Sequence, residues 1–284
     1  MALFRAVETA EPPDRRLFED PYAVALLSGT LKALAEIARW PMIGRLVPAF
    51  LDLGWPHTRS SGVVRTRLID DLVGEAIRAG AAQLVLLGAG FDSRAYRLPE
   101  AKGVVAFEVD HPASQRAKRQ RLNLRLGQVP ATVHFVEVDF ERDDLERALL
   151  TAGFNPARPA VAVWEGVVSY LSEAAVYANL AVLARLLAPT SRLILTYVDQ
   201  AALDGSRAFR GARRWRFWVR FQGEPFLFGF DPDTLAGYLR PLGFLLQSDV
   251  STAEAARLYR ASSLRNETGS EWYRVAAIAR AHAM

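Results

Sequence analysis

Glycines and carboxylates follow several apolar runs of this chain, at places where their chemistry suits ligand binding. Gly88-Ala89-Gly90 comes directly after the apolar run from Leu84 to Leu87. A Gly-x-Gly turn after a strand lets the backbone bend tightly and lets a ligand approach where a Cβ atom would clash. Ser93 stands where the dinucleotide fingerprint has its third glycine, which argues against a nicotinamide or flavin site. We therefore expect these glycines to bind a ligand other than a nicotinamide or flavin dinucleotide.

An acidic residue closes each of the next three apolar runs. Asp110 comes about 20 residues after the glycine turn, where a carboxylate can accept hydrogen bonds from both hydroxyls of an adenosine ribose. Glu108 lies two residues earlier on the same side of an alternating strand, so either acid could serve. Asp139 is placed to reach an adenine amino group while Phe140 packs on the ring, and Glu165 ends the fourth run. Together the acids outline one crevice at the carboxyl ends of a parallel sheet.

Three side chains are candidates for a general base: Glu165, His57 and Tyr22. Tyr22 and Trp164 are also candidate substrate contacts. Tyr22 lies in the N-terminal segment that we expect to cap the main domain, and Trp164 lies beside the expected crevice. No spacing of histidines and carboxylates indicates a metal site. His111, next to the ribose acid, is a further candidate ligand contact, although shaping the turn is the simpler role.

Arginines alternate with aromatic residues between Arg207 and Phe221. Within this segment Arg214, Trp215 and Trp218 could form a wall that binds a planar acidic or aromatic substrate. Nucleic acid would also suit such a wall, since bases stack on aromatic rings and phosphates pair with arginine. The structural alternative is an amphipathic helix with its arginines facing outward.

These side chains need a sheet to position them, and the apolar runs predict one. The first five runs are short, rich in valine and leucine, and separated by helix-like stretches, which is typical of parallel strands covered on both faces. Right-handed crossovers then give a doubly wound α/β sheet. Two later runs complete the set, and the last is expected to be antiparallel. The predicted strands are 84–87, 104–109, 133–138, 160–164, 193–198, 244–250 and 272–279.

Helix signals lie between the runs. The spacing of apolar residues predicts a helix from Ser61 to Ala79 capped by Gly80, and one from Ser172 to Leu187. Another is expected from Asp231 through Leu239, with a proline in its first turn. Residues 1–60 have an amphipathic pattern broken by prolines, so we expect a helical cap that lies against the main domain. The predicted domains are this cap and residues 61–284, with 200–230 as an insertion that lines the substrate site.

Composition excludes several classes of protein. The 284 residues include 35 basic and 31 acidic ones, and their net charge of +4 comes mainly from arginine. Such a surplus suits anionic partners, but it is also ordinary in chains from GC-rich genomes. The chain has no cysteine, which excludes disulfides, thiolate metal sites and a cysteine nucleophile. No apolar run is long enough to span a membrane and no signal-peptide pattern is present, so we expect a cytoplasmic protein without a membrane partner.

Several motifs in this order resemble the leucine carboxyl methyltransferase superfamily, whose members use S-adenosyl-L-methionine. The glycine-turn string is highly specific, and the likeness extends over nearly the whole chain. The motifs that carry it are Phe18 to Ala23, Arg65 to Asp71, Leu87 to Leu98, Phe107 to Pro112 with Lys118, Trp164 to Leu171, and Phe228 to Pro232.

The resemblance implies a class I methyltransferase fold: a Rossmann-like sheet of seven strands with an antiparallel last strand. It implies that Arg65 binds the carboxylate of the methionine moiety and that the turn from Gly88 to Gly90 lines that moiety. Asp110 would hold the ribose and Asp139 with Phe140 the adenine. Glu165 would lie beside the methionine amino group or the substrate. Members often have leucine where this chain has Phe140, which alters the adenine site but keeps its acid.

The expected reaction is methyl transfer to a small-molecule natural product, at a carboxylate or hydroxyl oxygen, with S-adenosyl-L-homocysteine as the other product and no metal. One alternative is C- or N-methylation of an indole-like ring, and another is modification of RNA. A nicotinamide oxidoreductase on the same sheet is a hypothesis of a different class. Nucleic acid is not the expected partner, and a homodimer is a possible assembly.

Overall fold

The computed structural model describes residues 1–40, 42–54, 58–209, 211–212, 226–259 and 269–281. Its strands form one mixed sheet in the order β3-β2-β1-β4-β5-β7-β6. Strands β1 to β5 pair in parallel, whereas β7 runs antiparallel to both β5 and β6. The strands are β1 Gln83–Leu87, β2 Val105–Asp110, β3 Val133–Glu137, β4 Ala160–Trp164, β5 Arg192–Val198, β6 Phe244–Ser251 and β7 Tyr273–Arg280. The predicted doubly wound sheet with an antiparallel last strand is confirmed.

Helices cover both faces of the sheet, which explains why its central strands are apolar throughout. Every residue of β1 and β4 is buried. Side chains alternate along β1: Val85 and Leu87 belong to one apolar core, while Leu84 and Leu86 belong to the other. The helices around the sheet are α4 Thr58–Arg78, α5 Arg94–Arg97, α6 Pro112–Leu126, α7 Leu145–Thr151, α8 Glu173–Leu186, α9 Gln200–Asp204, α11 Leu235–Leu239 and α12 Thr252–Tyr259.

The predicted helix boundaries agree with the structure where a capping residue marks them. The side chain of Ser172 accepts a hydrogen bond from the backbone N–H of Ala175 at 3.2 Å, so α8 begins as expected. Gly80 has φ of +109° after the end of α4. The backbone N–H of Ala81 then donates to the carbonyl of Ala76 at 3.0 Å, a closing bond typical of a glycine-terminated helix.

The predicted helix from Asp231 is wrong at its start, because α11 begins at Leu235. The Asp231 carboxylate accepts a hydrogen bond from the backbone N–H of Asp233 at 3.0 Å. The backbone carbonyl of Asp231 accepts hydrogen bonds from the backbone N–H groups of Thr234 and Leu235. This side-chain turn holds Asp231 to Asp233 outside the helix, since aspartate competes with helical hydrogen bonding when it can bond to nearby backbone groups.

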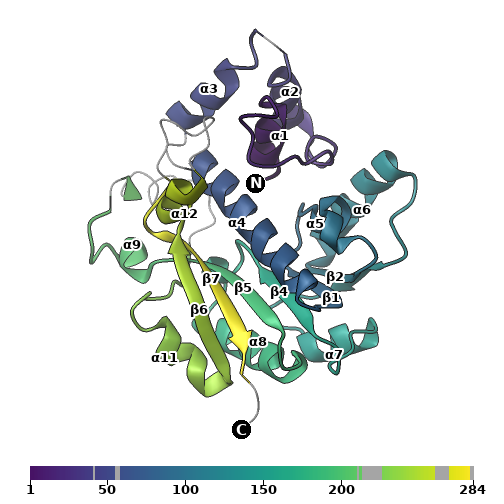
Figure 1. The fold of residues 1–284 in the computed structure, drawn as a ribbon, viewed down its shortest axis with the longest axis vertical. Helices are drawn as coiled ribbons and strands as arrows, with labels where there is room; N and C mark the ends of the chain where they lie inside the picture. The colour runs from purple at the N-terminus through teal and green to yellow at the C-terminus, as the bar shows by residue number, and fades with distance from the viewer. Residues whose placement is uncertain (41, 55–57, 210, 213–225, 260–268, 282–284) are drawn as a thin grey trace.

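Helices α1 Ala2–Ala10, α2 Gly29–Ile37 and α3 Leu46–Gly54 lie together at one end of the molecule (Figure 1). They share a small apolar core of their own, and α1 and α3 also contact α4. In Figure 1 the arrow of β7 points away from these helices, and β7 is antiparallel to β5. The parallel strands therefore end on the side where the three helices lie.

Among the described residues, no helix is long and apolar enough to cross a membrane.

Candidate functional site

The glycine turn after β1 is fixed against the end of β2. The backbone N–H groups of Gly88 and Ala89 both donate to the carbonyl of Val109, at 2.8 and 3.0 Å. Gly88 and Gly90 have φ of +66° and +40°, in the left-handed region that favours glycine. A Cβ atom on Gly88 would lie 2.0 Å from Cγ2 of Val167, in the loop after β4. Both backbone angle and space therefore require glycine at position 88.

Asp110, the last residue of β2, faces this turn. One carboxylate oxygen accepts a hydrogen bond from the backbone N–H of Gly90, and the other accepts from the N–H of His111 at 2.7 Å. A Cβ atom on Gly90 would lie 3.9 Å from the Asp110 carboxylate. The backbone thus orients a partly exposed carboxylate, which keeps lone pairs for further donors.

Glu108, the alternative acid on β2, has a different partner. Its side chain is fully buried and accepts a hydrogen bond from Nζ of Lys118 at 2.8 Å. Burial raises the pKa of Glu108 above its ordinary value, although Lys118 opposes the shift. Of the two acids, Asp110 is therefore the one that a ligand can reach without displacing a buried ion pair.

Asp139 lies next to Asp110 at the same edge of the sheet. The backbone N–H of Val138 donates to the carbonyl of Asp110 at 3.0 Å, which places the ends of β2 and β3 side by side. Phe140 is half-buried, with its ring centroid 6.0 Å from that of Trp164. Asp110, Asp139 and Phe140 therefore lie side by side at the carboxyl ends of β2 and β3, next to the glycine turn.

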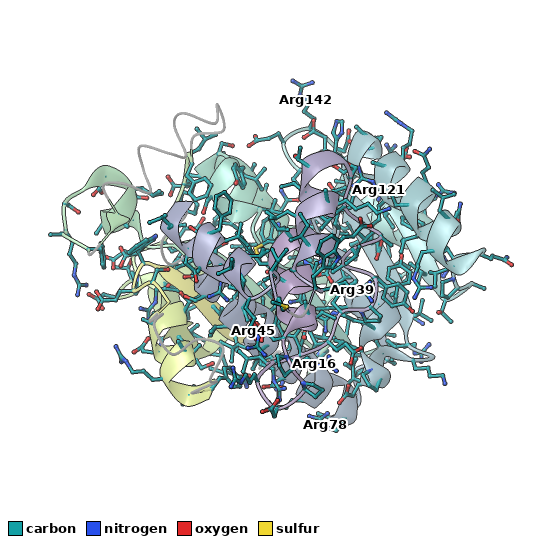
Figure 2. All side chains as sticks on the ribbon, turned by 90° about the horizontal axis from the view of Figure 1, so that it is seen from above. Arg16, Arg39, Arg45, Arg78, Arg121 and Arg142 are labelled. Atoms are coloured by element: carbon teal, nitrogen blue, oxygen red, sulfur yellow. The ribbon has the colours of Figure 1, made fainter. Side chains whose placement is uncertain are left out.

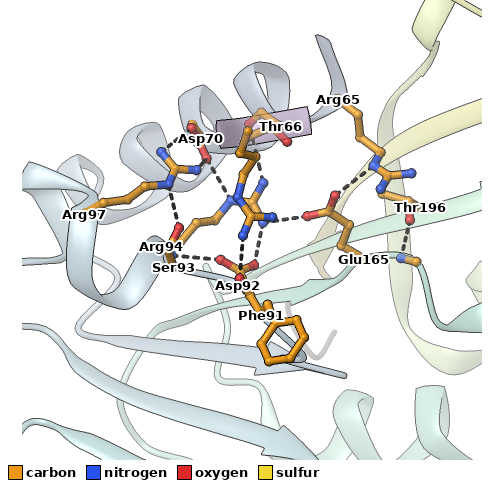
Figure 3. A network of polar contacts seen from close by, with 12 residues as sticks. Arg65, Thr66, Asp70, Phe91, Asp92, Ser93, Arg94, Arg97, Glu165 and Thr196 are labelled. Atoms are coloured by element: carbon orange, nitrogen blue, oxygen red, sulfur yellow. Dashed lines mark hydrogen bonds and ion pairs between the residues drawn. The ribbon is translucent and has the colours of Figure 1, made fainter. Parts of the chain in front are cut away.

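Glu165, which follows β4, lies between two arginines (Figure 3). One carboxylate oxygen accepts from Nε of Arg65 at 2.8 Å, and the other accepts from Nη1 of Arg94 at 2.6 Å. Burial alone would raise the pKa of Glu165, but the guanidinium groups of Arg94 and Arg65 outweigh it and hold this pKa far below its usual range. A carboxylate so stabilised is a weak proton acceptor, so the geometry does not support Glu165 as a general base.

Arg65 is positioned by more than its ion pair. It lies on the buried face of α4, and its guanidinium carbon is 4.5 Å from the ring centroid of Tyr273. Within the described part of the chain, only Nε of Arg65 makes a hydrogen bond, and its acceptor is Glu165. Its two Nη groups are therefore available for the bidentate binding of a carboxylate that arginine geometry favours.

The ion pairs continue from Glu165 toward the start of α5 (Figure 3). Arg94 also binds Asp70 through Nε at 2.8 Å and Asp92 through Nη1 at 2.6 Å, and Arg97 binds Asp70 at 2.7 Å. Burying a charge is costly unless it is paired and hydrogen-bonded, and these pairs meet that condition. The network connects α4, α5 and the loop after β4.

A second group of buried side chains connects α1 to the glycine turn. The Asp20 carboxylate accepts from Nε of Arg5 at 2.7 Å and from Oγ of Ser93 at 2.6 Å, and its side chain is wholly buried. Arg5 also donates through Nη2 to the carbonyl of Phe91. We call Arg5, Asp20 and Ser93 the cap latch. Asp20 and Ser93 each lie in one of the sequence motifs. Nothing in the sequence indicates that these two residues contact each other or that Arg5 contacts Asp20.

The remaining predicted residues have varied surroundings. His111 is the N-cap of α6, where its Nδ1 accepts from the N–H of Ala113 at 3.3 Å. Tyr22 is half-buried beside Tyr96, with ring centroids 6.0 Å apart. Trp164 is wholly buried in the larger core, and its indole nitrogen has no hydrogen-bond partner among the described residues. Because Trp164 presents no surface, the structure does not support its predicted contact with a substrate.

Four predicted residues lie outside the described residues: His57, Arg214, Trp215 and Trp218. The described ranges contain no group of histidine, aspartate and glutamate side chains that could hold a metal ion.

Known proteins with similar sequences are methyltransferases by name. A protein of Mycobacterium tuberculosis, provisionally named an S-adenosyl-L-methionine-dependent methyltransferase, is 43% identical over 130 residues. That alignment covers 46% of this chain but only 37% of the relative, so the chain spans little more than a third of that protein. A provisionally named S-adenosyl-L-methionine-dependent methyltransferase of Frankia alni is 32% identical over 271 residues, or 89% of this chain and 90% of the relative.

Solved structures share the fold. A provisionally assigned methyltransferase from Thermobifida fusca superposes with a TM-score of 0.60 at 16% identity and covers 97% of both chains. An O-methyltransferase family protein from Burkholderia thailandensis superposes with a TM-score of 0.53 at 16% identity, over 85% of this chain and 73% of that one.

The family model of leucine carboxyl methyltransferases matches residues 1–184 of this chain, including the Arg65 helix, the glycine turn, the acid that ends β2 and the acids that follow β3 and β4. The chain belongs to the leucine carboxyl methyltransferase family.

Proposed function

We propose that this protein is an S-adenosyl-L-methionine-dependent methyltransferase that methylates a carboxylate or hydroxyl oxygen of a small-molecule acceptor. The observation that carries the proposal is the Asp110 carboxylate, which the backbone of Gly90 and His111 orients at the edge of the sheet beside the glycine turn. The family and the provisional names of the relatives support the same activity.

The residues at this edge fit the cofactor. A Cβ atom on Gly90 would lie 3.9 Å from the Asp110 carboxylate, so the bare backbone there keeps the approach to that carboxylate open, whereas the space beside Gly88 is filled by Val167. The partly exposed carboxylate of Asp110 suits the two ribose hydroxyls. Asp139, beside it, suits the adenine amino group.

The methionine moiety carries a carboxylate and an ammonium group, and the crevice offers a partner for each. Arg65 would bind the carboxylate through its two Nη groups. Glu165 would fix the orientation of Arg65 and add negative charge for the ammonium group. Ala89 and the glycines on either side of it would line the rest of the methionine moiety. Phe140 would pack against the adenine ring.

When bound, S-adenosyl-L-methionine supplies an electrophilic methyl group on a sulfonium. The main contribution of the protein is then to hold the acceptor oxygen against that methyl group and to exclude water. A carboxylate acceptor needs no general base at neutral pH, whereas a hydroxyl acceptor does. Because two arginines hold Glu165 in its ionised, weakly basic form, Glu165 would not act as that base, which supports a carboxylate over a hydroxyl as the acceptor.

We also propose that residues 1–60 act as a cap over the crevice and that the insertion at 200–230 contacts the acceptor. The contacts of α1 with α4 and with the loop that carries Phe91 support the first part. The alternation of arginine and aromatic residues in the insertion supports the second, because such side chains suit an anionic or aromatic acceptor.

Calorimetry with S-adenosyl-L-homocysteine tests the cofactor site. We expect the wild-type protein to bind it and the Asp110→Asn variant to bind at least about tenfold more weakly, since the hydroxyls lose a charged acceptor. Asp233→Asn, at an exposed position before α11, is the matched control and should bind like the wild type. No binding by the folded wild type, or equal binding by Asp110→Asn, would contradict the proposal.

The acceptor atom requires a separate experiment. Incubation of the enzyme and cofactor with small-molecule carboxylates, phenols and indoles, followed by mass spectrometry, should reveal a product heavier by one methylene unit. Hydrolysis of the product in mild base would identify a methyl ester. A base-stable product with the methyl group on carbon or nitrogen would overturn the assignment to oxygen while leaving the cofactor site intact.

A further inference from the structure

Helix α3 is apolar on two faces, although only one of them is buried. Val47 and Leu51 pack into the core of the cap. Leu46, Phe50 and Leu53 follow each other at helical spacing on the other side, and they are 65%, 63% and 77% exposed. A helix that is apolar all round normally has partners on every side. The exposed stripe therefore indicates a surface that becomes covered.

The stripe continues into the connection between α2 and α3. Trp40, Met42 and Ile43 are 59%, 86% and 51% exposed. In Figure 1 this connection is the outermost point of the molecule at the α1–α3 end of its long axis. We call Trp40, Met42, Ile43 and the three stripe residues of α3 the apolar tip. The apolar tip is therefore exposed at the outermost end of the molecule, where a partner can reach it.

Positive charge accompanies the apolar tip. Arg39 directly precedes the tip in the sequence and Arg45 lies between Ile43 and Leu46; both are exposed, and Figure 2 shows both on the face that is seen from the α1–α3 end. The acids of the same segment are already paired: Glu36 with Lys32 at 4.0 Å, and Asp52 with Arg59 at 2.7 Å. Arg39 and Arg45 have no ion-pair partner within the described ranges. The surface therefore presents apolar side chains together with two cations.

A lipid surface matches this combination better than a second copy of the chain does. Two-fold pairing of the tips would bring equal charges together, and α3 has only nine residues, or about 14 Å, which is short for a stable dimer interface. An anionic bilayer instead offers an apolar interior, an interfacial region that tryptophan prefers, and negative headgroups for arginine.

We propose that the apolar tip docks the protein peripherally on anionic membranes, with Phe50, Leu53 and Met42 entering the acyl boundary and Arg39 and Arg45 contacting headgroups. A search of the sequence for membrane-spanning segments does not find this surface, because such a search looks for long runs of consecutive apolar residues and the residues of the tip are not consecutive. The proposal does not depend on the methyl acceptor or on the proposed reaction.

Co-sedimentation of the full-length protein with vesicles tests this binding. The wild type should pellet with vesicles that contain phosphatidylglycerol, more weakly with pure phosphatidylcholine, and less as salt is added. The Phe50→Ser, Leu53→Ser double variant should bind at least about tenfold more weakly to both kinds of vesicle. The Arg39→Gln, Arg45→Gln variant should lose the preference for phosphatidylglycerol.

Leu124→Ser is the matched control, because Leu124 on α6 is 84% exposed, more than Phe50 or Leu53, but lies outside the apolar tip. It should bind vesicles like the wild type. Circular dichroism and binding of S-adenosyl-L-homocysteine report whether each variant is folded. Absence of the wild type from all vesicle pellets would overturn the proposal, and so would equal losses in the control. A dimer that only the Phe50→Ser, Leu53→Ser variant disrupts would identify a second copy as the partner instead.

Discussion

Glu8 is a buried carboxyl group and Glu165 a largely buried one, and their surroundings shift their pKa values in opposite directions. Two guanidinium groups hold Glu165 ionised. Glu8 on α1 accepts one hydrogen bond, from the backbone N–H of Leu17 at 2.6 Å, and its second oxygen is buried with no partner among the described residues. Burial therefore raises the pKa of Glu8 to about 7, although the bond from Leu17 opposes the shift. Neighbouring charge, and not burial alone, decides which form is stable.

The raised pKa of Glu8 predicts a pH dependence of the stability. The folded protein retains this proton up to about pH 7, whereas the unfolded chain loses it near the ordinary glutamate pKa of 4.5. Folding therefore takes up a proton between these values, and the free energy of unfolding should fall as pH rises through that window. Glu8→Gln removes the effect and should be more stable than the wild type above pH 7, by up to about 3 kcal/mol.

Urea unfolding at a series of pH values measures this difference. Glu173→Gln, at an exposed position in the first turn of α8, is the control and should keep the pH slope of the wild type. If Glu8→Gln and the wild type have parallel pH profiles between pH 4.5 and 7, the assignment of the shift to Glu8 is wrong.

At the scale of single elements, the turn between β1 and α5 requires the most specific geometry. It begins at Gly88, whose N–H bonds to the end of β2, and it closes on Asp110 through Gly90. The strands on either side provide rigid support, since β1 pairs with both β2 and β4 along its length. The turn is therefore positioned by the sheet, while its own conformation depends on glycine.

Gly88→Ala should damage both stability and cofactor binding. Alanine at φ of +66° is strained by about 1–2 kcal/mol, and its Cβ atom would meet Val167 at 2.0 Å. We expect a lower free energy of unfolding in urea and the loss of S-adenosyl-L-homocysteine binding in calorimetry.

Gly237→Ala is the matched control for this substitution. Gly237 lies in α11, where a Cβ atom would meet nothing within 4 Å. Since alanine is the better helix former, this variant should be as stable as the wild type or more stable by about 0.5–1 kcal/mol. Equal effects of the two substitutions would show that the turn has no special requirement for glycine.

At the scale of the whole molecule, two clusters of buried polar side chains join parts of the chain that are far apart in sequence. The network around Arg94 holds α4, α5 and the loop after β4 together. The cap latch joins α1 to the turn that precedes α5. Because the latch reaches the backbone of Phe91 beside the glycine turn, the position of α1 and the shape of the cofactor turn should depend on each other.

Asp20→Asn tests that coupling. The substitution leaves Arg5 buried without its counter-charge, which should lower stability by about 3 kcal/mol or more. It should also weaken binding of S-adenosyl-L-homocysteine in calorimetry and speed amide hydrogen exchange in α1. Glu19→Gln, next to it but in an exposed pair with Arg16, should change none of these by a comparable amount. Weaker stability with unchanged cofactor affinity would show that the latch is structural only.

The sequence by itself determined the sheet, both ends of α8, the C-terminal ends of α4 and α11, and the places where a ligand turn and its acids must stand. These features depend on local signals: continuous apolar runs, helical spacing, and capping residues such as Ser172 and Gly80. The tertiary structure decided which side chains meet. It buried Glu108 against Lys118 and left Asp110 open, and it placed Glu165 between two arginines.

The tertiary structure also buried Trp164 in the core, joined Arg5 to Asp20 and left one face of α3 exposed. The sequence could not determine these contacts, because each one pairs residues from different elements or depends on what covers a surface. A periodic pattern shows that a side chain faces inward, but the partner it meets there depends on how whole elements pack against one another.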